Sequence, residues 1–206
     1  MLNKKIKKYH IILASKSPRR QFLLKELGLC FEIRTKEVDE SFPKKLKGRQ
    51  IALYLCKKKA EAFKNELRSN DLLITADTIV WIGNKVLNKP AGYNEAVKML
   101  QLLSGKMHTV YTGVCIALPS PVGDVPDSYR EGVRSKAFCV STKVFFKKLT
   151  DKEIHFYVSN YKPYDKAGAY GAQEWIGYVG VAKIIGSYFN VMGLPVKELY
   201  EELMKL

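Results

Sequence analysis

The feature that most constrains the fold is an apolar run near the N-terminus that leads directly into helix-start signals. Residues 10–14 (HIILA) predict a buried strand. Ser17 is typical of a helix N-cap, Pro18 of the first helical position, and Gly28 of the residue just past a helix end. The segment therefore predicts a strand, a tight turn and a helix.

Two arginines fall in the first turn of that helix. Arg19 and Arg20 lie at the positive end of the helix dipole, where each cation costs roughly 0.3–1 kcal/mol. A bound polyanion would reverse this cost, because free backbone N–H groups, the dipole and two guanidinium groups all attract phosphate oxygens. We interpret the turn as a phosphate site. The alternative is a surface helix whose arginines are solvated.

Length and charge limit the classes of partner. The 206 residues suit one domain covering 1–206, and the formal net charge of +15 favours anionic ligands. Lysine runs such as 57–59 make nucleic acid an option, but they are more often a solvated face. The chain shows no zinc-finger, RNP or basic-zipper pattern. We therefore expect a nucleotide ligand, which satisfies the same charge preference, and no nucleic-acid partner.

Other function classes are disfavoured by what the chain lacks. It has no run of about 18 apolar residues, and its basic start lacks the apolar segment of a signal peptide. We expect a cytoplasmic protein with no membrane partner. The three histidines show no metal or triad spacing, so acid–base chemistry is expected from carboxylates. The scattered cysteines are expected to be reduced core thiols: Cys30, Cys56, Cys115 and Cys139.

Periodicity and turn signals predict alternating strands and helices along the rest of the chain. Strands are expected at 31–35, 71–82, 85–87, 108–118, 134–146, 178–185 and 187–192. Helices are expected at 49–67, 94–103, 150–159 and 195–206. A Pro- and Gly-rich stretch predicts a hairpin or loop excursion near 119–133. This order predicts an α/β fold, a mixed twisted sheet flanked by helices.

Three side chains stand out as candidates for chemistry. Asp77 interrupts an apolar, β-branched strand, where an ionised carboxylate is costly unless it is paired, hydrogen-bonded or bound to metal. The structural alternative is a bulge that satisfies Asp77 locally. Glu40 lies in a turn-like segment with adjacent carboxylates. Lys59 flanks the buried stripe of the 49–67 helix and points either into a cleft or to water, and both stay open.

Several motifs in the same order resemble one family. They are residues 13–20 (LASKSPRR), 38–40 (VDE), 59–60, 76–80 (ADTIV), 87–90 (LNKP), 103–105 (LSG), 165–173 (DKAGAYGAQ), 186–188 and 193–195. This set resembles the Maf-like nucleoside triphosphate pyrophosphatases over nearly the whole chain. The motif 166–173 looks like the branch that acts on dTTP and UTP.

The resemblance implies a fold similar to that of inosine triphosphate pyrophosphatases, with two lobes around a central cleft. It implies hydrolysis of a nucleoside triphosphate to the monophosphate and pyrophosphate with a divalent metal, Mg²⁺ or Mn²⁺. The family is linked to inhibition of septum formation and often forms homodimers, so a homodimer is a further expectation.

Carried over by motif, Asp77 matches the proton acceptor, and Arg19, Thr78 and Gln173 match positions that influence substrate choice. The remaining polar active-site positions are Glu40, Lys59 and Lys89, and Ser15 joins the substrate-binding group. Our hypothesis is that Glu40 and Asp77 hold the metal and that Asp77 also activates water. Arg19, Arg20, Lys59 and Lys89 would clamp the triphosphate, and Thr78 and Gln173 would meet the base edge.

Two alternatives to this activity stay open. One is a pyrophosphatase that acts on modified or methylated nucleotides. The other is a nucleotide-sensing regulator of septum formation, which would use the basic surface to contact a division component or nucleic acid. A panel of nucleotides would separate these alternatives.

Overall fold

The computed structural model describes residues 2–119 and 134–206. The helices are α1 (Leu2–Ile6), α2 (Pro18–Glu26), α3 (Arg49–Glu61), α4 (Tyr93–Leu103), α5 (Asp151–Tyr161), α6 (Trp175–Gly180), α7 (Tyr188–Met192) and α8 (Val196–Leu203), with a 3₁₀ turn η2 (Ala167–Ala169). The strands are β1 (His10–Leu13), β2 (Glu32–Ile33), β3 (Asp71–Ile82), β4 (Lys85–Leu87), β5 (Met107–Leu118), β6 (Arg134–Phe146) and β7 (Val181–Ile185).

The described strands form one mixed sheet. Its order is β2-β1-β3-β5-β6-β7, and β4 pairs with β3 beyond the end of β1. β1 pairs in parallel with both β2 and β3, whereas the remaining pairs are antiparallel. The expectation of an α/β fold with a mixed sheet flanked by helices is confirmed.

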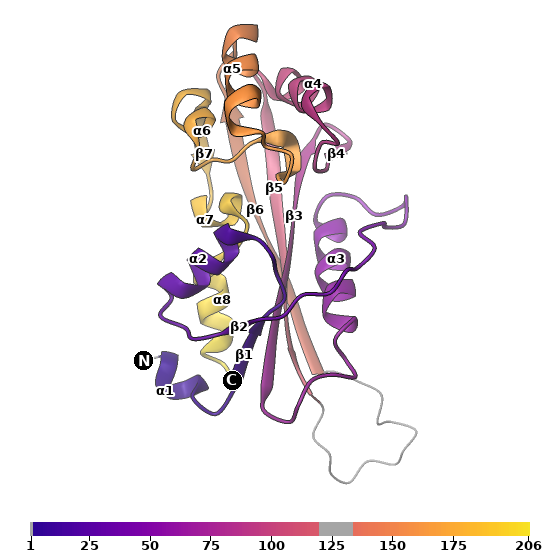
Figure 1. The fold of residues 1–206 in the computed structure, drawn as a ribbon, viewed down its shortest axis with the longest axis vertical. Coiled ribbons are helices and arrows are strands. Elements are labelled where there is room, and N and C mark those ends of the chain that lie inside the picture. Colours follow the sequence, from indigo (N-terminus) through magenta and orange to yellow (C-terminus); the bar gives the residue numbers. More distant parts are fainter. Residues whose placement is uncertain (1, 120–133) are drawn as a thin grey trace.

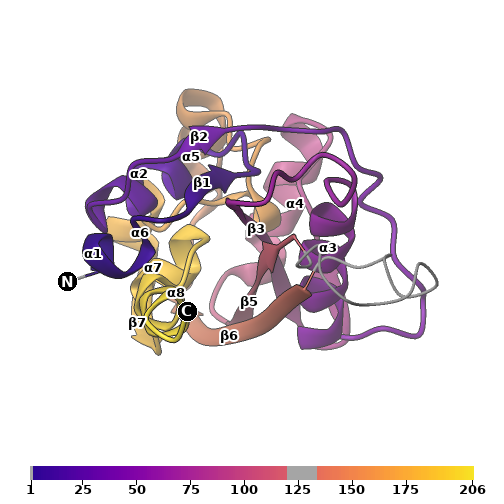
Figure 2. The same cartoon turned by 90° about the horizontal axis from the view of Figure 1, so that it is seen from below.

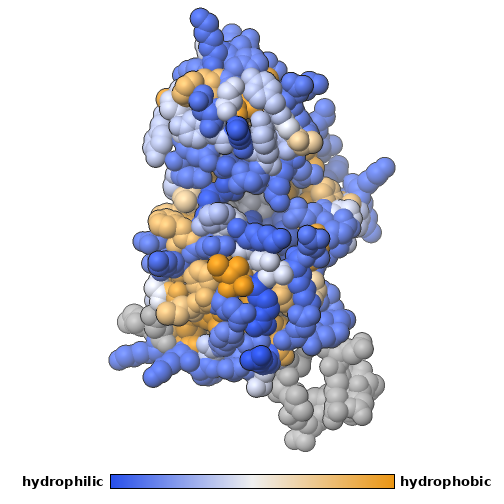
Figure 3. All heavy atoms as spheres, viewed as in Figure 1, coloured by the Kyte–Doolittle hydropathy of each residue, from blue (hydrophilic) through white to orange (hydrophobic). Residues whose placement is uncertain are grey.

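The helices cover the long strands in two groups, one above the other (Figure 1). In the lower part, α3 packs on one face of β3 and β5, and α1, α2, α7 and α8 cover the other (Figure 2). In the upper part, α4, α5, α6 and η2 enclose a separate core that contains Tyr157. The space-filling view shows mainly hydrophilic atoms around the waist between these parts (Figure 3). Two lobes therefore share the strands β3, β5 and β6.

The N-terminal prediction is confirmed. β1 is followed by the N-cap Ser17, and Pro18 begins α2. Beyond the C-cap of α2, Gly28 has φ 74°, a left-handed conformation that glycine adopts at little cost. The tight β1–α2 connection thus brings both arginines to the waist of the molecule.

Two strand predictions near the C-terminus are wrong. Residues 188–192 form the helix α7, because the Ser187 side chain accepts a hydrogen bond from Asn190 N and Gly193 ends the helix with φ 116°. Only Val181–Ile185 of the predicted 178–185 strand is extended, and the residues before it belong to α6. In α6 a Cβ at Gly177 would lie 1.9 Å from the carbonyl oxygen of Ala172, so only glycine allows this compact turn.

Other boundaries also differ from the predictions. The helix predicted at 49–67 ends at Glu61 and continues as turns, while α1 forms in a start that we interpreted only as basic. Apart from Pro119, the excursion predicted near 119–133 lies outside the described residues. None of the helices in the described part of the chain is both long and apolar enough to cross a membrane.

The cysteine prediction is correct only in part. All four cysteines are free thiols, and Cys56 and Cys115 are buried between α3 and the sheet. Cys139 is half-buried and Cys30 is exposed, so the prediction of a core thiol is wrong for Cys30. Cys30 lies in the connection between α2 and β2, outside the packed layers.

Candidate functional site

A cavity of about 860 Å³ lies at the waist, where the two lobes meet. Its walls come from the β1–α2 turn, the segment before α3, the middle of β3, the residues after β4, and the loop around η2. All nine candidate residues line it: Ser15, Arg19, Arg20, Glu40, Lys59, Asp77, Thr78, Lys89 and Gln173. The fold therefore brings together acidic and basic groups that are far apart in the sequence. The role of each one remains a prediction.

The β1–α2 turn supplies the first wall of the cavity. Ser15 is buried, and its Oγ accepts hydrogen bonds from Ser17 N at 3.2 Å and from Arg20 Nη1 at 3.4 Å. The Ser17 side chain makes no capping hydrogen bond to α2. The first turn of this nine-residue helix consequently presents backbone N–H groups and two guanidiniums at the edge of the cavity.

Arg20 is a part-buried cation whose described hydrogen bonds all go to neutral oxygens. Its guanidinium donates to Gly193 O at 2.9 Å and to Thr78 Oγ1 at 3.0 Å, besides Ser15. Burial lowers the pKa of Arg20, an effect that the negative charge of Asp77 opposes. An arginine keeps its proton even so, which leaves a positive charge oriented toward the cavity. Such a charge favours an anionic ligand.

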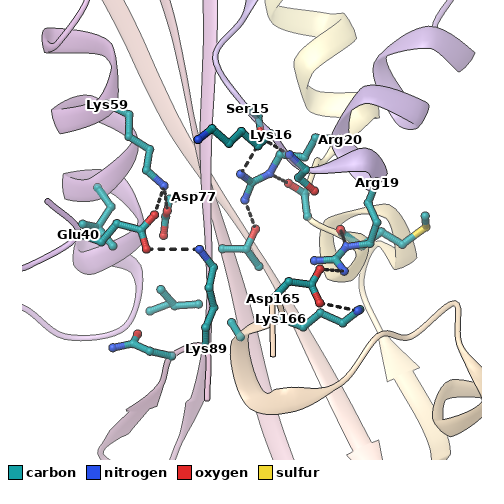
Figure 4. Close-up of a pocket in the computed structure, with 18 of the residues that line it drawn as sticks. Ser15, Lys16, Arg19, Arg20, Glu40, Lys59, Asp77, Lys89, Asp165 and Lys166 are labelled. Carbon is teal, nitrogen blue, oxygen red and sulfur yellow. Dashed lines mark hydrogen bonds and ion pairs between the residues drawn. The ribbon is translucent and has the colours of Figure 1, made fainter. Parts of the chain in front are cut away.

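Arg19 connects the two lobes across the cavity. Its Nε donates to Met192 O at 3.2 Å, and its Nη1 lies 3.7 Å from Asp165 Oδ2 in the loop before η2 (Figure 4). The carbonyls of residues 192 and 193, at the end of α7, thus hold both arginines. Gly193 makes this possible, since its φ of 116° turns the chain sharply after α7.

The carboxylates of Asp77 and Glu40 meet at one ammonium group. Lys59 of α3 donates to Asp77 Oδ1 and, at 2.8 Å, to Glu40 Oε1 (Figure 4). Lys89 Nζ lies 3.5 Å from the other oxygen of Glu40. Burial raises the pKa of Glu40, but the two lysines more than offset it, so the net pKa is below the ordinary value. Of the two orientations left open for Lys59, the structure has the one that points into the cleft.

Thr78 contacts Arg20, whereas it was predicted from the sequence to contact the nucleotide base. Its hydroxyl accepts from Arg20 and lies 3.0 Å from Thr112 Oγ1, which in turn donates to Asn190 O. Gln173 follows η2 in the upper lobe. The contacts of Thr78 therefore support a role in orienting Arg20, and Gln173 is the stronger candidate for the base.

Five further charged residues line the cavity and were not among the candidates. Lys36 and Glu37 come from the segment before α3, and the other three are Lys16, Asp165 and Lys166. Lys166 is buried and pairs with Asp165 at 2.7 Å and Glu174 at 3.0 Å. Lys16 is exposed, makes no hydrogen bond or ion pair with the described residues, and extends into the cleft (Figure 4). Lys16, Asp165 and Lys166 lie inside the motifs quoted above, and membership of those motifs is the sequence signal that could have identified them, whereas Lys36 and Glu37 lie outside the motifs.

The donor set suits a divalent cation that is bound together with a polyanion. Among the described residues, no group of three or more His, Cys, Asp or Glu side chains is placed to hold a metal. Two carboxylates do converge, and Mg²⁺ is commonly bound by one or two carboxylates plus substrate phosphates. Glu40 and Asp77 therefore fit a metal that arrives with its nucleotide better than one held by protein alone.

Comparison with known proteins agrees with this site. The family model of the Maf-like proteins matches residues 10–206, which include every residue of the cavity. The chain belongs to the Maf-like protein family. It is 49% identical over 200 residues to the dTTP/UTP pyrophosphatase of Bacteroides thetaiotaomicron, covering 97% of each chain. It is 48% identical over 206 residues to the dTTP/UTP pyrophosphatase of Flavobacterium johnsoniae, covering 100% of each.

A solved structure gives a weaker match. The crystal structure of the nucleoside-triphosphatase / dITP/XTP pyrophosphatase from Mycobacterium abscessus aligns with 66% of this chain and covers 74% of its own. The TM-score is 0.37 and the identity 14%, a likeness too slight to support an inference. Membership of the family therefore rests on the sequence matches.

Proposed function

We propose that this Maf-like protein hydrolyses dTTP and UTP to the nucleoside monophosphate and pyrophosphate. The relatives with full coverage and nearly half of their residues identical are named as dTTP/UTP pyrophosphatases. The observation that carries the proposal is the single cavity in which Asp77 and Glu40 lie opposite Arg19 and Arg20. Hydrolysis of a triphosphate needs both groups, because the carboxylates activate water and the arginines neutralise the charge of the phosphates.

In the proposed reaction a water oxygen bonds to the α-phosphorus, the bond to the α–β bridging oxygen breaks, and pyrophosphate leaves. Asp77 accepts the proton of the attacking water, since it is the most buried carboxylate of the cavity. Arg19, Arg20 and Lys89 bind the phosphate oxygens and stabilise the negative charge of the leaving group. Lys59 keeps Glu40 ionised and orients both carboxylates.

A divalent metal is part of the proposal. Glu40 and Asp77 would hold Mg²⁺ or Mn²⁺ together with the phosphates, and the ion would neutralise part of the negative charge of the phosphate groups. In the part of the cavity wall that follows η2, Gln173 would offer an amide with both a donor and an acceptor to a pyrimidine edge.

The decisive experiment is a panel of nucleotides incubated with the purified protein, with Mg²⁺, with Mn²⁺ and with EDTA. The panel contains dTTP, UTP, CTP, 7-methylguanosine triphosphate and ITP, and it measures pyrophosphate and orthophosphate separately. We expect pyrophosphate and monophosphate in equal amounts from dTTP and UTP, and loss of turnover with EDTA. Release of orthophosphate, or faster turnover of a purine or methylated nucleotide, would contradict the proposal.

A further inference from the structure

Gln173 lies in a tight turn at the upper wall of the cavity. Glu174 N donates to Gly171 O at 3.0 Å, which closes the turn around Gln173. A Cβ on Gly171 would lie 3.1 Å from Gln173 Nε2, so the amide group packs directly over Gly171. Gln173 Oε1 is buried and has no hydrogen-bond partner among the described residues. The amide oxygen is thus a buried acceptor that this part of the protein leaves unused.

One hydroxyl group holds both ends of this turn. Tyr157, fully buried on α5, accepts a hydrogen bond from Gly171 N at 3.0 Å and donates its own proton to Glu174 Oε2. Burial and the adjacent carboxylate of Glu174 raise the pKa of Tyr157, so the proton stays on the hydroxyl. The hydroxyl therefore accepts a hydrogen bond from the first residue of the turn and donates one to the last.

The same turn is connected to the opposite wall of the cavity. The second oxygen of Glu174 lies 3.0 Å from the buried Lys166 Nζ, which also contacts Asp165 at 2.7 Å. Asp165 in turn faces Arg19. A continuous line of polar contacts therefore runs from Tyr157 through Glu174, Lys166 and Asp165 to Arg19, and its last three members line the cavity.

We propose that Tyr157 is a positioning residue for base selection, which acts by fixing the turn that carries Gln173. This inference rests on the proposed function. Uracil and thymine present an acceptor where cytosine presents a donor. Rotation of an amide by half a turn exchanges its donor and acceptor, so a mobile Gln173 would match either base. A fixed Gln173 matches one of them and leaves a group unpaired with the other.

The test is Tyr157→Phe, which deletes the hydroxyl and keeps the ring. We measure kcat/KM for UTP and for CTP, and the affinity for the α,β-methylene analogues of both nucleotides. The preference for uridine over cytidine should fall about tenfold, which corresponds to one hydrogen bond of typical strength. The kcat for UTP should change less than the ratio.

Tyr161→Phe is the matched control. Tyr161 lies on the same helix with its ring stacked on that of Tyr157 at 5.0 Å, but it is exposed and its hydroxyl has no hydrogen bond with the described residues. This variant should keep the wild-type preference. Glu174→Gln is the second test, because it retains an acceptor for Tyr157 while removing the charge that faces Lys166, and it should lower the ratio in the same direction.

A double variant separates positioning from general destabilisation. If Tyr157 acts through Gln173, then Tyr157→Phe should leave the ratio unchanged once Gln173→Ala is present. The inference would be overturned if Tyr157→Phe left the UTP-to-CTP ratio of kcat/KM unaltered, or lowered it equally with and without the Gln173 side chain. Equal binding of the UTP and CTP analogues by the wild-type protein would also overturn it. Tight uridine preference without pyrophosphate release would instead overturn the proposed function alone.

Discussion

Single side chains set the charge balance in the cavity. Lys59 neutralises Asp77 and Glu40 together, Lys89 adds a second contact to Glu40, and Arg20 has only neutral partners among its described hydrogen bonds. Both carboxylates are therefore paired with lysines and Arg19 faces Asp165, whereas Arg20 has no anionic partner among its described hydrogen bonds. A bound triphosphate supplies the missing negative charge beside Arg20.

The role of Asp77 is tested by Asp77→Asn, which keeps the size of the side chain but removes its basicity. We expect kcat to fall about 10²–10⁴-fold, the range for loss of a general base, and KM to rise, because Asp77 also helps to hold the metal that binds with the nucleotide. Steady-state pyrophosphate release from dTTP measures both constants. Asp39→Asn is the control, because Asp39 is exposed, pairs with Lys58, and does not line the cavity. Equal turnover in the two variants would remove Asp77 from the mechanism.

The candidate residues were predictable where they broke a local rule. Asp77 is a carboxylate in an apolar strand, and Arg19 and Arg20 are cations at the positive end of a helix. The contacts of Lys166 and Tyr157 were not predictable, because burial of a lysine depends on partners that the fold supplies from other segments. The family motifs predicted Gln173 as a site residue, but only the structure shows that Tyr157 contacts both ends of the turn that carries it.

Among the elements, the short helix α7 links stability to ligand binding. Its C-terminal carbonyls hold Arg19 and Arg20, and its N-cap is the Ser187 side chain, which accepts from Asn190 N at 3.2 Å. Loss of this cap should loosen α7 and with it both guanidiniums. The helix thus contributes to the cavity through its ends.

We predict that Ser187→Ala lowers the free energy of unfolding by about 1 kcal/mol, the usual effect of losing an N-cap. It should also raise KM for dTTP, since the arginines lose part of their support. Urea denaturation and initial rates measure these two effects. Ser104→Ala is the comparison, because that hydroxyl bonds Leu149 in the upper lobe and lies outside the cavity lining. The KM of Ser104→Ala for dTTP should stay at the wild-type value. A similar rise of KM in both variants would refute the proposed connection between α7 and nucleotide binding.

Strands bounded by clear turn signals were predicted well from sequence, including the short strand β4, whereas two short elements near the C-terminus were assigned the wrong type. β3, β5 and β6 appear within a residue of the expected bounds, because each is a long run with clear turn signals at its ends. The last three residues of α6 and all of α7 were assigned to strands because these segments contain aromatic and β-branched residues. In α7 the caps at Ser187 and Gly193 decide the conformation, and local propensity does not.

Across the entire fold, the three long strands make one rigid frame for two lobes. β3 carries Asp77 and Thr78 at its middle and continues into the upper core, so both walls of the cavity are fixed to the same sheet. The upper lobe also contains a buried ionisable pair next to the cavity wall. His108 Nε2 lies 2.7 Å from Tyr170 Oη, and Tyr170 lines the cavity.

This pair makes global stability depend on pH. Burial lowers the pKa of His108 from 6.5 to about 4 in the folded protein. Between these values the unfolded chain binds more protons than the folded one, so the stabilising effect is complete above pH 6.5 and is lost as pH falls toward 4. From pH 7 to pH 5 the loss is about 2 kcal/mol.

The measurement is urea denaturation of the wild-type protein and of His108→Gln at pH 7, 6 and 5. His108→Gln keeps a polar partner for Tyr170 but does not titrate, so its free energy of unfolding should fall less over this range than that of the wild type. Carboxylates whose pKa lies below the ordinary value, such as Glu153 at about 2, also lose stabilisation in acid, but they do so in both proteins. The difference between the two slopes therefore isolates His108, and parallel slopes would show that its imidazole titrates equally in the folded and unfolded states.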